Sequence, residues 1–233
     1  MLKNDLILRN PLRLMGKTTD EILHEGGFGA VLSRAGVGKT ALVVQLALDS
    51  MLREKNVLHI SLQDPIEKVT LWYRELFQNL ITEYNAEQIH DLWDRILPCR
   101  FIMTFKIAGF SVPKLEERLA DLTEQNIFTP SMIIIDGFSF SESELSQLPG
   151  LKELAERCRI RLWFTVPVHR DETFGPDGFP VRLAETADLF DVALALKPAD
   201  TEIRIEAPKS GEPDIPDTGI FLDPATMLIK DRH

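Results

Sequence analysis

Ser33-Arg34-Ala35-Gly36-Val37-Gly38-Lys39-Thr40 is the stretch that decides the fold. The apolar run Ala30-Val31-Leu32 precedes it as a predicted strand, and apolar residues at helical spacing follow it. A strand, a glycine-containing loop and a helix in this order are typical of a phosphate-binding loop, in which backbone N–H groups surround phosphate oxygens. An ordinary turn with a lysine beside it is the alternative. The flanking strand and helix favour the phosphate-binding loop.

The residue types in this stretch fit separate tasks. Gly36 and Gly38 allow the backbone to approach a phosphate, Lys39 is placed for the outer phosphates, and Thr40 is expected to hold Mg²⁺. Ser33 replaces the first glycine of the pattern G-x-x-x-x-G-K-[ST], whereas G-x-G-K-T is intact. The residues expected to bind a nucleotide are Ser33, Arg34, Ala35, Gly36, Val37, Gly38, Lys39, Thr40 and Ala41.

The composition limits the class of protein. The chain has 233 residues, of which 44% are hydrophobic, and a formal net charge of −10. At this length one α/β domain with a sizeable core is the default. The acidic excess does not favour DNA as a partner, because nucleic-acid affinity comes mostly from cations that neutralise phosphates; a local basic channel is still compatible with it.

The cysteines and the N-terminal residues favour a cytoplasmic protein. Cys99 and Cys158 are too few and too far apart for a disulfide scaffold or a thiolate metal site. Residues 1–14 are interrupted by charges and lack the apolar core of a signal peptide. No apolar run approaches membrane-spanning length, so we expect no membrane insertion.

Strand and helix signals alternate along the chain, which predicts an α/β fold with a mainly parallel, twisted sheet flanked by helices. We expect a leader at residues 1–25, with a short capped helix at 18–23, and one domain at 26–233. C-terminal β-hairpins are expected to complete the sheet. The further predicted strands lie at 57–62, 100–105, 132–136, 161–166, 192–196, 203–207, 220–222 and 227–229, and the further predicted helices lie at 66–80, 85–98, from 113 onward and at 151–158.

Asp136 ends the apolar strand Met132-Ile133-Ile134-Ile135. In phosphate-loop proteins an aspartate at the end of a neighbouring strand orients Mg²⁺ and its waters, the Walker B role. Asp136 and Thr40 are therefore the predicted metal ligands.

Five segments in order resemble RecA-fold ATPases, in particular the branch of DnaB-type helicases, RadA-type recombination proteins and KaiC-type clock ATPases. Residues 34–42 resemble Walker A and residues 133–136 resemble Walker B. Residues 57–64 correspond to the family's second strand, 164–170 to its sensor strand, and 205–211 to its K-x-R-x-G segment. The resemblance covers roughly residues 15–230 and implies a RecA-like P-loop NTPase core.

That resemblance implies an ATP-binding ATPase that uses Mg²⁺ and assembles as a homo-oligomeric ring or filament. In the family the second strand ends on a catalytic glutamate, and Gln63 stands there, followed by Asp64. An amide orients water but accepts no proton, so we expect slow hydrolysis. Asp64 is either the substitute base or the N-cap of the next helix, with Pro65 at its first position and Glu67 closing a capping box.

The resemblance implies that Lys209, and secondarily Arg170, acts across a subunit interface. The alternative is that Lys209, beside Pro208 and Gly211, is a solvated turn residue. Lys209-Ser210-Gly211 lacks the family's arginine, and the sensor position near Val166 and Pro167 is apolar. The loop at 167–180 stands where the family has a DNA-binding loop, yet Arg170 is offset there by Asp171, Glu172 and Asp177.

Three functions remain open on the sequence. A nucleotide-dependent regulator or remodeller of a protein partner is favoured. A DNA-dependent ATPase of the helicase or recombination-mediator type is the second, and a P-loop phosphotransferase is the third. The phosphotransferase would need an acceptor pocket and an arginine-rich lid. No N-K-x-D-like segment supports GTP.

Overall fold

The computed structural model describes residues 2–10, 12, 22–81, 86–106, 109–175, 178–209 and 219–231. Strands and helices alternate through most of this length. In chain order they are α1 (Leu2–Arg9), β1 (Phe28–Ser33), α3 (Lys39–Leu52), β2 (Val57–Ser61), α4 (Ile66–Leu80), α5 (Ala86–Ile96), the 3₁₀ turn η2 (Leu97–Cys99), β3 (Arg100–Thr104), α6 (Val112–Glu124), β4 (Met132–Asp136), α7 (Glu142–Leu145), α8 (Leu148–Cys158), β5 (Arg161–Pro167), the 3₁₀ segment η4 (Val181–Leu189), β6 (Val192–Pro198), β7 (Ile203–Lys209), β8 (Ile220–Leu222) and β9 (Ile229–Asp231).

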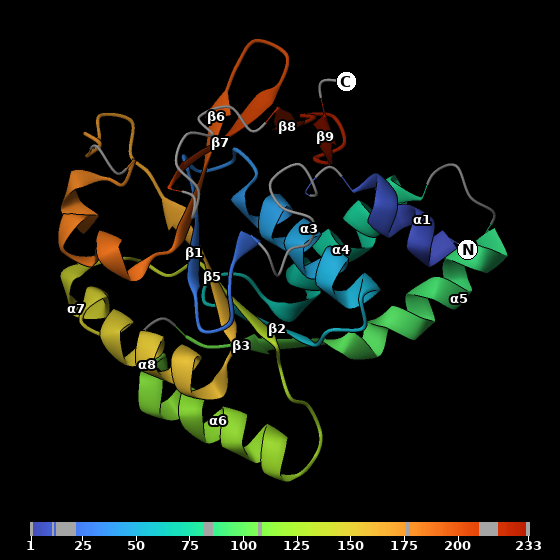
Figure 1. Cartoon of the computed structure of the whole chain (residues 1–233), viewed down its shortest axis with the longest axis horizontal. Coiled ribbons are helices and arrows are strands. Elements are labelled where there is room, and N and C mark those ends of the chain that lie inside the picture. The colour runs from blue at the N-terminus through green and yellow to red at the C-terminus, as the bar shows by residue number, and fades with distance from the viewer. Residues whose placement is uncertain are drawn as a thin grey trace.

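Within the described residues, nine strands form one sheet in the order β3-β2-β4-β5-β1-β6-β7-β8-β9. The six strands from β3 to β6 pair in parallel, and β7, β8 and β9 continue antiparallel from β6. Figure 1 shows α3, α4 and α5 on one face of the parallel part and α6 and α8 on the other. The predicted α/β class, the mainly parallel sheet and the C-terminal hairpins are confirmed.

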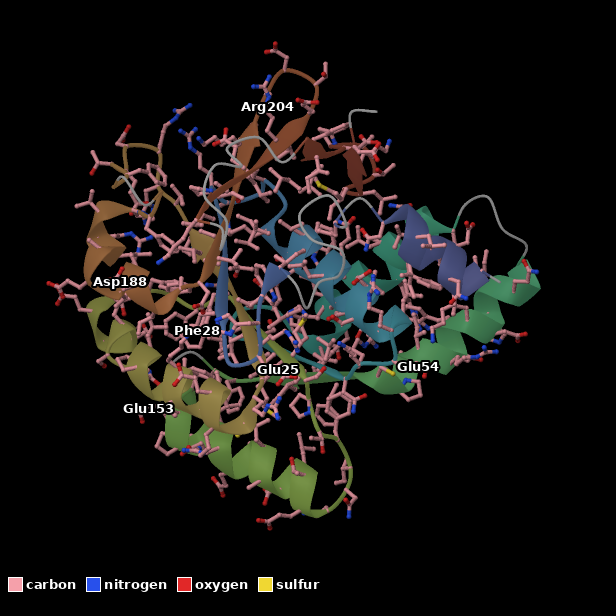
Figure 2. The ribbon with its side chains drawn as sticks, in the orientation of Figure 1. Glu25, Phe28, Glu54, Glu153, Asp188 and Arg204 are labelled. Atoms are coloured by element: carbon pink, nitrogen blue, oxygen red, sulfur yellow. The ribbon has the colours of Figure 1, made fainter. Side chains whose placement is uncertain are left out.

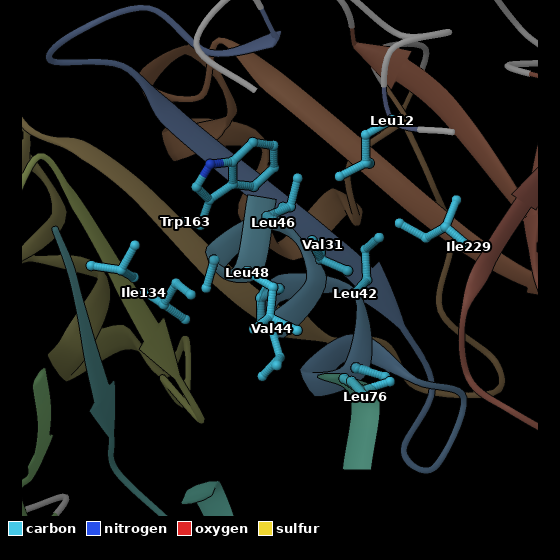
Figure 3. Close-up of a cluster of buried hydrophobic side chains, with 14 of the residues drawn as sticks. Leu12, Val31, Leu42, Val44, Leu46, Leu48, Leu76, Ile134, Trp163 and Ile229 are labelled. Carbon is cyan, nitrogen blue, oxygen red and sulfur yellow. The ribbon is translucent and has the colours of Figure 1, made fainter. Parts of the chain in front are cut away.

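The central strands are apolar throughout because both faces of the sheet are covered. Residues of β1 and β4 are buried along almost their whole length. Alternate residues enter different cores: Val31 and Ile134 pack with α3 and α4, whereas Ile133 and Phe164 pack with α6 and α8. Figure 3 shows the first of these cores around the buried Trp163.

The second core is rich in phenylalanine. Phe28 and Phe164 have ring centroids 5.0 Å apart, and Phe164 and Phe190 have centroids 5.6 Å apart. In Figure 2, Phe28 lies inside the molecule, while charged side chains such as Glu153 and Asp188 stand at its periphery. The two cores hold β1, β4 and β5 in fixed register between the helical layers.

Several elements differ from the sequence prediction. The helices α1 and α7 and the segment η4 were not expected. Residues 18–21 of the predicted capped helix lie outside the described residues. The last strand begins at Ile229, because Met227 has a left-handed φ of 56° in the preceding turn.

The N-terminal region packs on the sheet domain. Leu6, Leu12, Ile22 and Leu23 are buried in the core formed with α3. The division into a leader and a domain stays a prediction. In the described parts of the chain, no helix is both long and apolar enough to pass through a membrane.

Candidate functional site

Four parallel strands bring the predicted site residues to one edge of the sheet. In the parallel register Ser33 lies beside Pro167, at the carboxyl ends of β1 and β5. Ser61 lies beside Asp136, at the carboxyl ends of β2 and β4. Ligands in parallel α/β sheets bind outside these carboxyl ends. Segments more than a hundred residues apart in the sequence thus meet at one place.

Residues 34–38 connect β1 to α3 in a conformation that depends on glycine. Gly36 has φ 77°, and Gly38, the N-cap of α3, has φ 119°. A Cβ on Gly36 would meet no atom within 4 Å, so open space lies beside the loop there. The N-cap Gly38 gives α3 no side-chain capping bond in the described structure. The positive end of this helix is therefore available to an anion.

Lys39 folds back into this loop. Its Nζ donates to the carbonyl oxygens of Ser33 at 2.9 Å and Arg34 at 3.0 Å. Burial lowers the pKa of Lys39, and the Asp136 carboxylate partly opposes this effect. The loop thus encloses an ammonium group whose present partners are two backbone oxygens and, at 3.5 Å, the Ser33 hydroxyl.

Asp136 lies at the centre of a small polar cluster. Its Oδ2 accepts the hydroxyl of Thr40 at 2.9 Å, and its Oδ1 accepts the hydroxyl of Thr165 at 2.7 Å. Thr165 also accepts the N–H of Gly137 at 3.0 Å. Burial acts to raise the pKa of Asp136, but His59 and these two hydroxyls outweigh it and bring the pKa below its usual value. The carboxyl group is therefore held ionised.

Gln63 and Asp64 lie just after β2, but their side chains have different partners. The Gln63 amide donates to the carbonyl oxygen of Gly137 at 3.1 Å, so it reaches the end of β4. The Asp64 carboxylate accepts Lys68 Nζ at 2.9 Å.

The prediction that Asp64 caps the next helix is wrong. Pro65 is the N-cap of α4, with no side-chain capping bond. The Ser61 hydroxyl takes the N–H of Asp64 and donates to its carbonyl, which fixes a turn before the helix begins. The third helical position is then Lys68, so a capping box with Glu67 is impossible.

Arg170 joins the same edge of the sheet, at a cavity of about 510 Å³. The cavity is lined by residues of β1, the β1–α3 loop, β6, β7 and the loop after β5, among them Arg34, Arg170 and Phe174. Arg34 Nη2 lies 3.5 Å from the Arg170 carbonyl oxygen. The adjacent Glu172 accepts the His169 N–H and the Arg182 side chain, and Asp177 lies outside the described residues.

Lys209 points back into its own chain. Its Nζ donates to the carbonyl oxygen of Ala187 in η4 at 2.8 Å. Ser210 and Gly211 lie outside the described residues. A reach toward another subunit would require this bond to break, and the trans role of Lys209 stays a prediction.

Two buried polar residues at this site were missed by the sequence analysis. Thr165 on β5 contacts Asp136 directly, one residue before the apolar sensor position at Val166. His59 on β2 is fully buried, with Nε2 3.8 Å from Asp136 Oδ2. Each is a polar residue inside an otherwise apolar strand, and that interruption is the signal that could have found them.

The Thr40 hydroxyl and the Asp136 carboxylate are oxygen donors, which suit a hard cation such as Mg²⁺. Across the described residues, no three His, Cys, Asp or Glu side chains gather as a metal site. Mg²⁺ usually keeps several waters and takes one or two carboxylates together with phosphates. Thr40 and Asp136, beside a loop that fits an anion, match that requirement.

Comparison of the chain with models of known protein families and with curated protein sequences gave no match.

Proposed function

We propose that this chain is a RecA-like P-loop ATPase that binds Mg·ATP at the β1–α3 loop. We propose further that it hydrolyses ATP slowly and acts as a homo-oligomeric, nucleotide-dependent regulator or remodeller of a protein partner. One observation carries the proposal. The Lys39 ammonium is enclosed by the loop, and the Thr40 hydroxyl at the start of the same helix binds Asp136.

The loop has what phosphate binding requires. The uncapped start of α3 and the positive-φ glycines Gly36 and Gly38 present backbone N–H groups. Lys39 would exchange its two carbonyl oxygens for phosphate oxygens, a stronger, charge-assisted interaction. Thr40 and Asp136 would hold the magnesium ion, which neutralises charge on the phosphates during transfer.

Slow hydrolysis follows from the groups at the end of β2. The Gln63 amide donates to Gly137 and accepts no proton from water. Asp64 lies beside it, but its carboxylate is paired with Lys68. A general base contributes about 10²–10⁴-fold to the rate. Without one at this position, the nucleotide state would persist long enough to act as a signal.

A DNA-dependent motor is the less favoured function. The net charge of −10 opposes a phosphate-binding surface. Arg34, Arg170 and Lys197 line the cavity and are the local cations that would serve such a role, although Lys197 is paired with Glu206. Stimulation of ATP turnover by single-stranded DNA would favour it over the regulator.

The test is Lys39→Ala, with Lys114→Ala, an exposed lysine on α6, as the matched control. We expect Lys39→Ala to weaken binding of a fluorescent ATP analogue by about 10- to 100-fold, as befits a lost hydrogen bond to a charged group. The melting temperature should change little, because the hydrogen bonds of the Lys39 ammonium in the described structure go only to the nearby Ser33 and Arg34. Equal affinity in wild type and Lys39→Ala would reject the proposal.

A further inference from the structure

His59 is a buried imidazole that the proposed function leaves without a task. It lies on β2 with none of its surface exposed, between Tyr73 of α4 and Asp136 of β4. Its Nδ1 lies 3.1 Å from the Tyr73 hydroxyl, and its Nε2 lies 3.8 Å from Asp136 Oδ2. A polar side chain at such a position needs partners, because an unpaired buried polar group is costly.

The Tyr73 hydroxyl and the Asp136 carboxylate together favour a hydrogen on Nε2, because a carboxylate only accepts and the phenol can donate to Nδ1. Tyr73 is fully buried, and burial raises its pKa, so the phenol stays protonated. In the described structure, His59 Nδ1 is the acceptor that this hydroxyl reaches. When Nδ1 accepts a hydrogen bond from this hydroxyl, the neutral imidazole carries its own hydrogen on Nε2.

That Nε2–H faces Asp136 without forming a hydrogen bond. Within the described residues Nε2 is buried and has no hydrogen-bond partner. The distance from Nε2 to Oδ2 is 3.8 Å, which is about 0.6 Å beyond the usual hydrogen-bond range of about 2.7–3.2 Å. Oδ2 is at present occupied by the Thr40 hydroxyl.

Magnesium binding by Thr40 would affect Asp136 Oδ2, the oxygen that the Thr40 hydroxyl now bonds and that His59 Nε2–H faces. If Thr40 turned its hydroxyl oxygen toward a magnesium ion and its hydrogen away from Asp136, Oδ2 would lose the hydrogen bond that now holds it. His59 Nε2–H is the nearby buried donor that would replace the Thr40 hydroxyl. A small rotation of the carboxylate would bring Oδ2 within hydrogen-bond distance of it. Groups behind a metal ligand orient it in this way in many metal sites.

We propose that His59 is a positioning residue for magnesium. When Thr40 turns its hydroxyl to the metal, His59 Nε2–H, oriented by Tyr73, donates a hydrogen bond to Asp136 Oδ2. The inference rests on the proposed function, since it assumes that Thr40 and Asp136 bind Mg²⁺ together with a nucleotide. It assigns a role at the metal site to His59, which lies outside the two segments that predict the metal ligands.

The test compares the Mg²⁺ concentration that half-saturates binding of a fluorescent ATP analogue, using the full-length chain. For His59→Leu we expect this concentration to rise about 10- to 100-fold, the usual cost of losing a group behind a metal ligand. Binding of the analogue in EDTA should not change. Mn²⁺ binding followed by electron paramagnetic resonance, with the nucleotide present, should weaken in parallel.

Two conservative variants separate positioning from packing. The amide nitrogen of Gln corresponds to Nε2, so His59→Gln should keep the wild-type Mg²⁺ dependence. The amide of Asn is shorter and corresponds to Nδ1, so His59→Asn should behave like His59→Leu. This pair keeps the test valid if His59→Leu fails to fold.

Leu58→Val is the control on the same strand, since Leu58 is buried in the opposite core. An equal shift in Leu58→Val, or no shift in His59→Leu and His59→Asn, would overturn the inference. A wild-type chain that binds no Mg·nucleotide would instead defeat the proposed function, and the wild-type arm shows this directly.

Discussion

Thr165 connects β5 to the end of β4 through one buried hydroxyl, which donates to Asp136 and accepts from Gly137. Because Thr165 holds Oδ1 at 2.7 Å, the carboxylate presents its other oxygen to Thr40. A residue of β5, the strand whose predicted sensor position is apolar, thus holds one oxygen of the predicted metal ligand. At the residue scale, the partners of a site residue decide what it can do.

Gln63→Glu is the substitution that we expect to raise ATP turnover. A glutamate cannot donate to the Gly137 carbonyl, so its carboxylate would turn from that oxygen toward water. A base at this position should increase the rate by up to about 10²–10⁴-fold, the range for general base catalysis. Single-turnover ATP hydrolysis measures the effect.

Asp64→Asn is the matched control for that experiment. Asp64 is paired with Lys68 in an exposed i, i+4 arrangement on the surface, so its loss should cost only about 0.3–0.5 kcal/mol of stability. Turnover should stay the same. A large drop in Asp64→Asn, with no gain in Gln63→Glu, would identify Asp64 as the base and contradict slow hydrolysis.

Part of this site could be predicted from the sequence, because a loop motif fixes spacing along the chain. Lys39 and Thr40 follow the glycines, and the apolar strand ends on Asp136, so their proximity follows from parallel strands. His59 and Thr165 reach Asp136 only through the register of β2, β4 and β5, which no local pattern specifies. The capping role of Asp64 is wrong, because the Ser61 hydroxyl competes for the local backbone; its role as a base stays a prediction.

At the element scale, β1 and β5 pack so closely that one position admits only glycine. A Cβ on Gly29 would lie 2.5 Å from the Trp163 ring, which is fully buried in the core with α3. We expect Gly29→Ala to destabilise the chain by about 1–3 kcal/mol, the usual cost of overpacking. Urea unfolding measures it.

Gly150→Ala provides a control of opposite sign. Gly150 lies in α8, and a Cβ there would meet Val112 at 3.5 Å, an ordinary contact. Alanine in a helix is favoured over glycine by up to about 1 kcal/mol, so this variant should be slightly more stable. If Gly29→Ala is as stable as Gly150→Ala, the conclusion that the Trp163 ring leaves no room for a Cβ at position 29 is contradicted.

The elements that the sequence predicts best are those with one dominant pattern. Buried strands such as β4 are short apolar runs, and α4 has a strong apolar stripe. The short helix α7 and the segment η4 have weak patterns and depend on their surroundings, as when Arg182 of η4 donates to the Pro167 carbonyl at 2.7 Å. Contacts of this kind cannot be inferred from spacing.

At the scale of the whole molecule, the C-terminal hairpin rests against the proposed nucleotide loop. A Cβ on Gly38 would lie 3.2 Å from Leu222 and 3.6 Å from Met227, so β8 and the turn after it border the start of α3. The buried Gln45 of α3 donates to the Met227 carbonyl at 2.8 Å and accepts the Ile229 N–H at 2.7 Å. The Gln45 side chain thus connects α3 to the C-terminal hairpin.

Gln45→Met should therefore loosen the hairpin more than it loosens the rest of the chain. Methionine is similar in size, so the core stays filled, but the Met227 carbonyl and the Ile229 N–H lose their partner. Each unsatisfied buried group costs about 1–3 kcal/mol. Hydrogen exchange should accelerate in residues 219–231 while the amides of β4 stay protected, because local opening needs less free energy than global unfolding.

Asn79→Ala is the control, since Asn79 donates to the Thr226 carbonyl at a part-buried position on the same turn. It should accelerate exchange there far less. If Gln45→Met also weakens binding of the ATP analogue, the hairpin supports the loop through Gly38. Uniformly faster exchange over the whole chain would contradict the argument, because it would mean that Gln45 stabilises the fold in general and does not act as a specific connection between α3 and the hairpin.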